Sequence, residues 1–91
     1  MEVIRRLEMD DLNGPVQEAK RIESLGYDGL AAHELRHDTL LRLAIAANAT
    51  ENIGIESRLT ISFPRSPMVM AMSAWDLQLY SKGRFKLGIG T

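Results

Sequence analysis

The chain has 91 residues, of which 45% are hydrophobic and 25% charged, as in an ordinary soluble globular domain. Its 11 Lys and Arg residues are balanced by 12 Asp and Glu residues, so the net charge of −1 offers no positive excess to hold nucleic acid. The absence of cysteine excludes disulfides and thiolate zinc sites. No apolar run approaches the roughly 20 residues that span a bilayer, and no signal-peptide core is present, so we expect a cytoplasmic protein without membrane contacts.

The chain begins with a predicted strand and a predicted helix. Residues 2–7 form a short run that includes β-branched side chains, which favours a strand. Pro15 suits the first turn of a helix, where its missing N–H costs nothing, and Gly26 suits the left-handed residue at which helices commonly end. Between these two residues, apolar side chains recur at helical spacing: Val16, Ala19, Ile22 and Leu25.

A second strand and helix follow in the same pattern. Residues 27–32 form a mainly apolar run that predicts a buried strand, and the polar stretch 33–38 ends it. Asp38 or Thr39 can cap the next helix through a side-chain oxygen, and Asn52 is a suitable end. The apolar face of this helix is predicted from its spacing: Leu40, Leu43, Ala44 and Ala47.

From Ile53 the apolar period changes to two, which predicts a third strand over residues 53–63 with one apolar face. Pro64 ends that strand, and Ser66 followed by Pro67 is a favourable helix start. We expect one apolar stripe of this third helix to pack in the core: Met68, Met72, Trp75 and Leu79. Residues 85–89 alternate again and predict a fourth strand.

The resulting order is β-α-β-α-β-α-β with short connections. Strands separated by helices predict an α/β fold with right-handed crossovers and a parallel sheet. No low-complexity segment or linker divides the sequence, so we expect one domain over residues 1–91.

Several short motifs, taken in order, resemble the luciferase-like monooxygenase family. They are Leu-Gly-Tyr-Asp-Gly-Leu at 25–30, Glu34 followed by His37 and Asp38, Phe-Pro-Arg-Ser-Pro-Met at 63–68, Ala-Trp-Asp-Leu-Gln at 74–78 and Gly-Arg-Phe-Lys-Leu-Gly-Ile-Gly-Thr at 83–91. Each motif is weak alone, but the ordered series is specific and covers essentially the whole chain. The resemblance is closest to the branch that uses the deazaflavin F420.

The resemblance implies a TIM-type (β/α)₈ barrel that binds FMN or F420 at the carboxyl ends of its strands and acts on a small-molecule substrate by hydride transfer or oxygenation. Such barrels typically have about 250 residues. The chain therefore looks like the N-terminal part of one, with strands one to four and helices one to three, and for that reason we expect the isolated chain to be inactive. A homo-oligomer is a further possibility.

In a barrel, the loops that follow the strands form the active face. The resemblance implies that Glu34 and His37 line this face, where they would handle protons or position the substrate. The alternative is a solvated loop that also caps the second helix, and this is the better interpretation for His33 alone. No metal site is expected, because His33 and His37 lack further ligands at a convincing spacing.

The resemblance also places a non-prolyl cis peptide bond in the third strand, at Arg58–Leu59, against the cofactor ring. The family usually carries small residues, often Gly-Thr-Gly, where this chain has Glu56-Ser57-Arg58. Large charged side chains there could obstruct a stacked ring. The alternative is that Glu56 and Arg58, two apart on one strand face, pair with each other or contact solvent.

The end of the chain carries Gly88 and Gly90, which are candidates for close approach of the backbone to a cofactor. The alternative is that these glycines occupy a crowded strand end. Arg65 could meet a phosphate or a carboxylate, and a capping or surface role is the alternative. The competing function for the whole chain is a non-catalytic remnant or a half-barrel assembly module, because four parallel strands without closure leave open edges.

Overall fold

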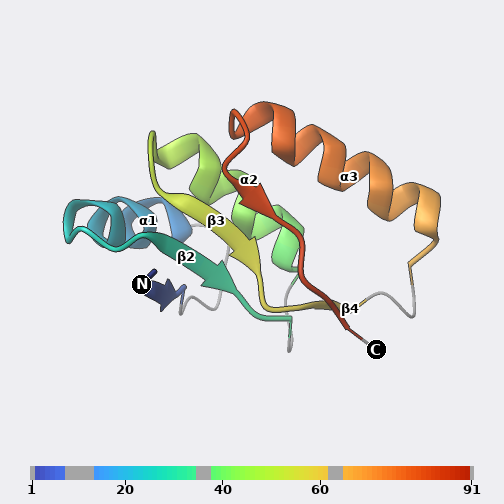
Figure 1. Ribbon diagram of the computed structural model, residues 1–91, viewed down its shortest axis with the longest axis horizontal. Helices are drawn as coiled ribbons and strands as arrows, with labels where there is room; N and C mark the ends of the chain where they lie inside the picture. Colours follow the sequence, from blue (N-terminus) through green and yellow to red (C-terminus); the bar gives the residue numbers. More distant parts are fainter. Residues whose placement is uncertain (1, 8–13, 35–37, 62–64, 91) are drawn as a thin grey trace.

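The computed structural model describes residues 2–7, 14–34, 38–61 and 65–90, and strands and helices alternate along it (Figure 1). The elements are β1 (Ile4–Arg6), α1 (Pro15–Ser24), β2 (Gly29–Ala32), α2 (Thr39–Ala49), β3 (Gly54–Ser57), β4 (Thr60–Ile61), α3 (Pro67–Tyr80), β5 (Phe85–Lys86) and β6 (Ile89–Gly90). No helix in these ranges is long and apolar enough to cross a membrane.

The sheet is parallel throughout, as the alternation of strands and helices predicts. Its strand order is β1-β2-β3-β5, and β4 pairs with β6 as a second parallel ladder. All three helices lie on one side of the sheet in Figure 1, with α2 between α1 and α3. The carboxyl ends of the strands therefore meet at one edge, while the face opposite the helices is uncovered by any described element.

The core lies between this sheet and the helices. Its members come from the strands and from all three helices, among them Leu7, Ile22, Leu30, Leu43, Ile55, Leu77 and Phe85. The predicted helix signals are in place, because the Asp38 carboxylate accepts the Leu41 N–H at 2.9 Å and the Ser66 hydroxyl accepts the Val69 N–H at 3.1 Å. Gly26 follows α1 with a φ of +87°, as expected for a left-handed helix end.

The prediction of one continuous third strand over residues 53–63 is wrong. The strand divides into β3 and β4, and the intervening Arg58–Leu59 peptide bond is cis, at the position that the family resemblance implies. The burial pattern also changes phase there. Ile55 and Ser57 are buried as alternation predicts, but beyond the cis bond Leu59 is exposed and Thr60 is buried. Phe63, the last apolar residue of the predicted strand, lies outside the described residues.

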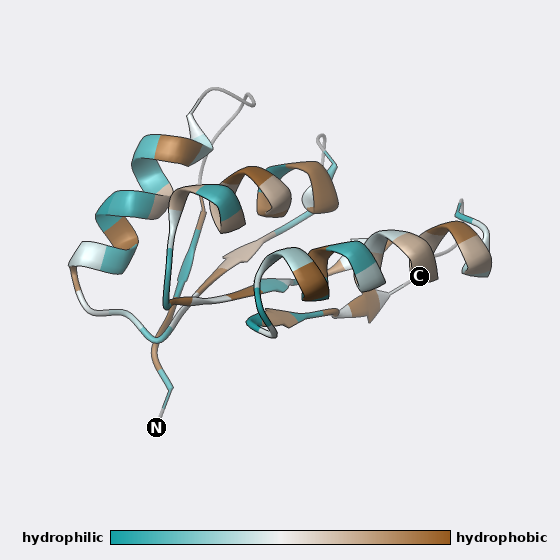
Figure 2. Cartoon of the chain, turned by 90° about the horizontal axis from the view of Figure 1, so that it is seen from above, coloured by the Kyte–Doolittle hydropathy of each residue, from teal (hydrophilic) through white to brown (hydrophobic). Residues whose placement is uncertain are grey.

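The predicted core stripe of α3 is also wrong. Met68, Met72, Trp75 and Leu79 are between 56% and 70% exposed, whereas Met70 and Leu77 are buried. Apolar residues recur on more than one side of α3, and its ribbon is brown or pale along most of its length in Figure 2, so helical spacing alone allowed more than one buried face. The face of α3 that packs inward is the one that carries Met70 and Leu77.

The predicted fourth strand divides as well, into β5 and β6. Between them Gly88 comes so close to β3 that a Cβ atom on it would overlap the Ser57 carbonyl oxygen. The Ser57 hydroxyl bridges the same junction, because it donates to the Gly88 carbonyl and accepts the Gly88 N–H, both at 2.9 Å. A glycine at 88 is thus required by the crowded strand end itself.

Two side chains that the sequence did not single out fasten the junction between α2 and β3. The Glu23 carboxylate accepts the backbone N–H groups of residues 51–53 at 2.8 to 3.3 Å. Burial opposes its ionisation, but these three bonds prevail and lower the pKa of Glu23. The Arg84 guanidinium donates to the carbonyl oxygens of Ala47, Thr50 and Ile53, which closes the C-terminal end of α2.

Candidate active site at the carboxyl edge of the sheet

Most of the predicted site residues meet at the carboxyl edge of the sheet. The Arg58 N–H donates to the Ala32 carbonyl at 2.8 Å, which places Arg58 beside the end of β2, where Glu34 follows. The Thr60 N–H donates to the Gly88 carbonyl at 2.7 Å, so Leu59 and the two glycines are neighbours. Predicted site residue His37 lies outside the described residues.

Glu34 lies at the centre of a dense ion-pair network. Its two carboxylate oxygens accept hydrogen bonds from the two terminal nitrogens of Arg65, at 2.6 and 2.7 Å, in a bidentate arrangement. The same carboxylate accepts the N–H of Ile61 at 2.8 Å and that of Thr39 at 3.1 Å. Both side chains are mostly withdrawn from solvent, Glu34 being 13% and Arg65 19% exposed. The network therefore ties the end of β2 to α2 and β4.

These contacts fix the charge of Glu34. The Arg65 guanidinium, aided by the N–H groups of Ile61 and Thr39 and opposed by burial, lowers the pKa of Glu34 to about 2. In turn, the hydrogen bonds that Arg65 donates to Glu34 raise the pKa of Arg65. A carboxylate with so low a pKa is a weak base near neutral pH, so this geometry supports a positioning role more than proton transfer.

Arg65 extends the network to two further groups. It donates to the Ile61 carbonyl at 2.7 Å and to the Asp38 carboxylate at 3.0 Å. Arg65 thus pairs with two carboxylates of the chain itself, one of which belongs to Asp38, the residue that caps α2. Beneath the ion pairs, the buried hydroxyls of Thr39 and Thr60 lie 2.8 Å apart and join α2 to β4 a second time.

The second charged pair at this edge is simpler. Arg58 Nε donates to the Glu56 carboxylate at 2.7 Å, and the Arg58 side chain is 56% exposed. This is the pairing of neighbouring strand residues that the sequence left as an alternative. Because only Nε is engaged in this bond, the two terminal nitrogens of Arg58 point their donors elsewhere.

His33 lies between these two pairs at the end of β2. Burial lowers its pKa, and the positive charges of Arg6, Arg42 and Arg58 lower it further, so the neutral imidazole is favoured. Its Nδ1 atom is buried and has no hydrogen-bond partner within the described part of the chain. The Arg42 guanidinium, itself buried, donates to the His33 carbonyl and to the Asp38 carbonyl.

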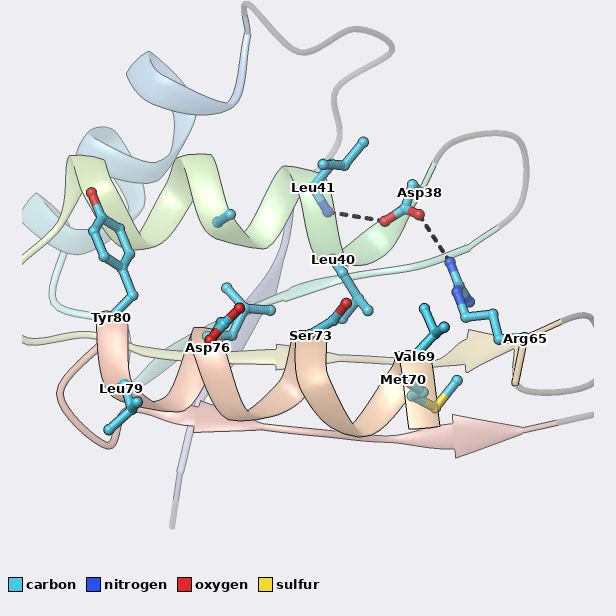
Figure 3. A pocket seen from close by; sticks show the side chains of 12 residues that line it. Asp38, Leu40, Leu41, Arg65, Val69, Met70, Ser73, Asp76, Leu79 and Tyr80 are labelled. Atoms are coloured by element: carbon cyan, nitrogen blue, oxygen red, sulfur yellow. Dashed lines mark hydrogen bonds and ion pairs between the residues drawn. The ribbon is translucent and has the colours of Figure 1, made fainter. Parts of the chain in front are cut away.

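A separate groove of about 750 Å³ runs between α2 and α3. Figure 3 shows Arg65 and Asp38 at one end of it and Tyr80 at the other. Apolar side chains line most of its length, among them Leu40, Leu41, Val69 and Met70. The groove lies between the helices, and Arg65 and Asp38 of the Glu34 network line one end of it. The residues in the described ranges include no cluster of three or more His, Asp or Glu that could hold a metal ion.

Comparison with known proteins decides the family. Residues 4–91 match the luciferase-like monooxygenase family. The chain belongs to this family. It is also 39% identical, over 92 aligned positions, to uncharacterised proteins of Mycobacterium bovis and Mycobacterium tuberculosis. The match covers 96% of this chain and 27% of each relative, so the chain spans about a quarter of their length.

Solved structures show the same fold for this luciferase-like chain. The FMN-bound oxygenating constituent of 3,6-diketocamphane monooxygenase from Pseudomonas putida matches with a TM-score of 0.85 at 22% identity, over 99% of this chain and 29% of that one. The coenzyme F420-dependent tetrahydromethanopterin reductase of Methanopyrus kandleri matches with a TM-score of 0.83 at 23% identity, over 99% and 27%. The parallel β/α arrangement is therefore that of part of a TIM-type barrel, as predicted.

Proposed function

We propose that this chain provides the first strands and helices of a luciferase-like oxidoreductase that works with FMN or F420 on a small-molecule substrate. The family match over residues 4–91 carries the proposal. The two structural relatives, whose descriptions name FMN and coenzyme F420, support the choice of cofactor. The proposal also includes a complete barrel, a small-molecule substrate and a cytoplasmic location. The family assignment does not include these three features.

The residues at the carboxyl edge fit such a cofactor. Leu59 and Ile89 are exposed there and offer apolar contact to a flat ring. Arg58 supplies unengaged cationic donors beside them, and the buried Nδ1 of His33 supplies a polar atom in need of a partner. An apolar ring with a polar or anionic substituent matches this combination of groups.

When bound, the cofactor supplies the hydride or the activated oxygen, and the protein supplies orientation and electrostatics. Within this chain, we assign Glu34 to holding the loop after β2 against β4 through Arg65. The low pKa of Glu34 keeps it ionised, so its charge stays constant through any reaction near neutral pH. The proton-handling role of His37, and the direct cofactor contacts of Gly88 and Gly90, stay predictions.

Fluorescence titration with FMN and with F420 tests the proposal. We expect saturable quenching of cofactor fluorescence at micromolar concentrations. Leu59→Asp places a charge on the exposed apolar contact and should weaken binding, whereas Leu25→Asp, at another exposed leucine just after α1, should not. The absence of any fluorescence change at micromolar cofactor would remove the catalytic interpretation of this chain.

The second candidate function is an assembly module, and the exposed apolar face of α3 favours it. Met68, Met72, Trp75 and Leu79 lie on that face, beside the apolar groove shared with α2. The proposed occupant is a second copy of the chain, giving a homo-oligomer. Light scattering should then report a dimer that Trp75→Glu converts to a monomer, with Leu25→Glu as the control. A wild-type monomer with a cooperative melt would contradict this candidate.

A further inference from the structure

The Glu34 network does not involve a group of charged residues on the uncovered face of the sheet, and of this group the proposed cofactor site uses Arg58 alone. Strand register places Arg6, Ala31, Glu56 and Lys86 in one row across β1, β2, β3 and β5. The adjacent row of Leu30, Ile55 and Phe85 is buried against the helices. Because successive strand residues point to opposite faces, the charged row faces away from the helices.

The same face continues to the carboxyl edge. His33 is two residues beyond Ala31, and Arg58 is two beyond Glu56, to which it is bonded. Arg6 and Arg58 both act on the imidazole of His33 electrostatically. The three side chains therefore belong to one neighbourhood, although they come from the ends of three different strands.

Around Arg6, His33 and Arg58, the described residues supply more hydrogen-bond donors than acceptors. Arg6 is exposed and forms no ion pair with the other described residues. Glu56 engages Arg58 through Nε alone, and the remaining carboxylates near His33, those of Glu34 and Asp38, are held by Arg65. The buried Nδ1 of His33 has no partner in the described ranges. A buried polar atom without a partner, on the same face as two arginines whose terminal nitrogens bind no other described residue, indicates a place for an anionic group.

We propose that Arg6, His33 and Arg58 form a binding site for an anionic group, a phosphate or a carboxylate. Guanidinium groups present several N–H donors in a planar fork that fits the oxygens of either anion. The neutral imidazole adds one N–H donor when its proton lies on Nδ1. The site itself follows from this chain's residues. Its assignment to one end of a bound cofactor or substrate rests on the proposed function.

Titration with inorganic phosphate, followed by NMR at constant ionic strength, tests the site. We expect saturable shifts of the His33 ring signals and of the Arg6 and Arg58 amides, which sodium chloride does not reproduce. Arg58→Gln and Arg6→Gln should each weaken phosphate binding by about tenfold, the loss of one charge-assisted contact. Arg21→Gln is the matched control, because Arg21 on α1 is 52% exposed and also pairs with one glutamate.

Chemical shifts that grow linearly with phosphate concentration, without saturation, would overturn the anion site. So would saturable shifts that persist in both Arg58→Gln and Arg6→Gln. Acetate in place of phosphate distinguishes the two anion classes. Comparison of FMN with riboflavin, which lacks the phosphate, distinguishes the sources. If phosphate competes with FMN and riboflavin binds more weakly, the anion belongs to the cofactor, and if phosphate and FMN bind together, it belongs to the substrate. FMN binding without any phosphate binding would refute the anion site alone and leave the proposed function standing.

Discussion

Two glutamate–arginine pairs lie at the carboxyl edge of this small sheet, and they are built differently. Glu34 and Arg65 form two direct hydrogen bonds, and Glu34 also accepts two backbone N–H groups. Glu56 and Arg58 share a single bond, with Arg58 largely in solvent. The first pair joins three elements, whereas the second lies within one strand end. The same pair of residue types therefore serves as a fixed support in one place and as an adaptable surface in the other.

Removing the arginine of the supporting pair should have the largest effect on stability. Arg65→Met leaves the mostly buried Glu34 carboxylate without its cation, and we expect the free energy of unfolding to fall by about 3 kcal/mol. Urea denaturation measures the change. Because Arg65 has the two partners Glu34 and Asp38, Asp38→Asn should cost much less. A loss below 1 kcal/mol in the Arg65 variant would mean that the network contributes little support.

The pH dependence of stability tests the same support through protonation. The pKa of Glu34 falls from its ordinary value of 4.5 to about 2 on folding, so its contribution is complete above pH 4.5 and is lost as the pH falls toward 2. We expect this loss to be about 2 kcal/mol after allowance for solvent screening. Urea midpoints measured from pH 7 down to pH 2 would show it.

Glu34→Gln is the control for that experiment. It should flatten the acid limb below pH 4.5 and leave unchanged the smaller decline that begins near pH 6.5, where protonation of His33 favours the unfolded chain because burial lowers its folded pKa. An acid limb of equal slope in Glu34→Gln would assign the dependence to other carboxylates.

The buried hydroxyl pair beneath the network predicts an intermediate effect. Thr60→Val keeps the volume but leaves the Thr39 hydroxyl with only its 3.4 Å contact to Glu34, and we expect a loss of about 1 kcal/mol. Thr39→Ser, which retains the hydroxyl, should lose less. Equal stability of wild type and Thr60→Val in chemical denaturation would show that the hydroxyl bond is dispensable.

The adaptable pair predicts the smallest effect on stability. Arg58→Met should change the free energy of unfolding by less than about 0.5 kcal/mol, because exposed ion pairs contribute little. The same variant should bind anions more weakly. Substitution of Arg58 should therefore affect binding with little effect on stability, whereas substitution of Arg65 should lower stability. A destabilisation of Arg58→Met equal to that of Arg65→Met would erase the distinction between the two pairs.

The sequence predicted the outline of this fold well, because the signals for it are local. Pro15 and Gly26 mark the two ends of α1, and Ser66 marks the start of α3. Alternating strands and helices were enough to predict a parallel sheet. Errors arose where tertiary contacts override local pattern. The phase of residues 53–63 reverses at Leu59, and the face of α3 that packs on the sheet is only one of its apolar faces.

The candidate site was predictable in part. Family resemblance indicated Glu34 and the Arg58–Leu59 bond, and the structure brings both to the carboxyl edge. The partner of Glu34 could not be read from the sequence, because Arg65 is 31 residues away and meets it only through tertiary packing. A bidentate ion pair between distant residues produces no periodic pattern in the sequence. The isolation of the His33 Nδ1 atom is likewise a property of the folded neighbourhood.

The most direct test of the central claim, that the carboxyl edge is a cofactor site, is a titration of the isotope-labelled protein with FMN and F420 followed by NMR. We expect saturable shifts concentrated at the amides of Arg58, Leu59 and Gly88, with little change at the Leu41 and Tyr80 amides in the groove between α2 and α3. Saturable shifts confined to that groove, or no saturable shift with either cofactor, would contradict it.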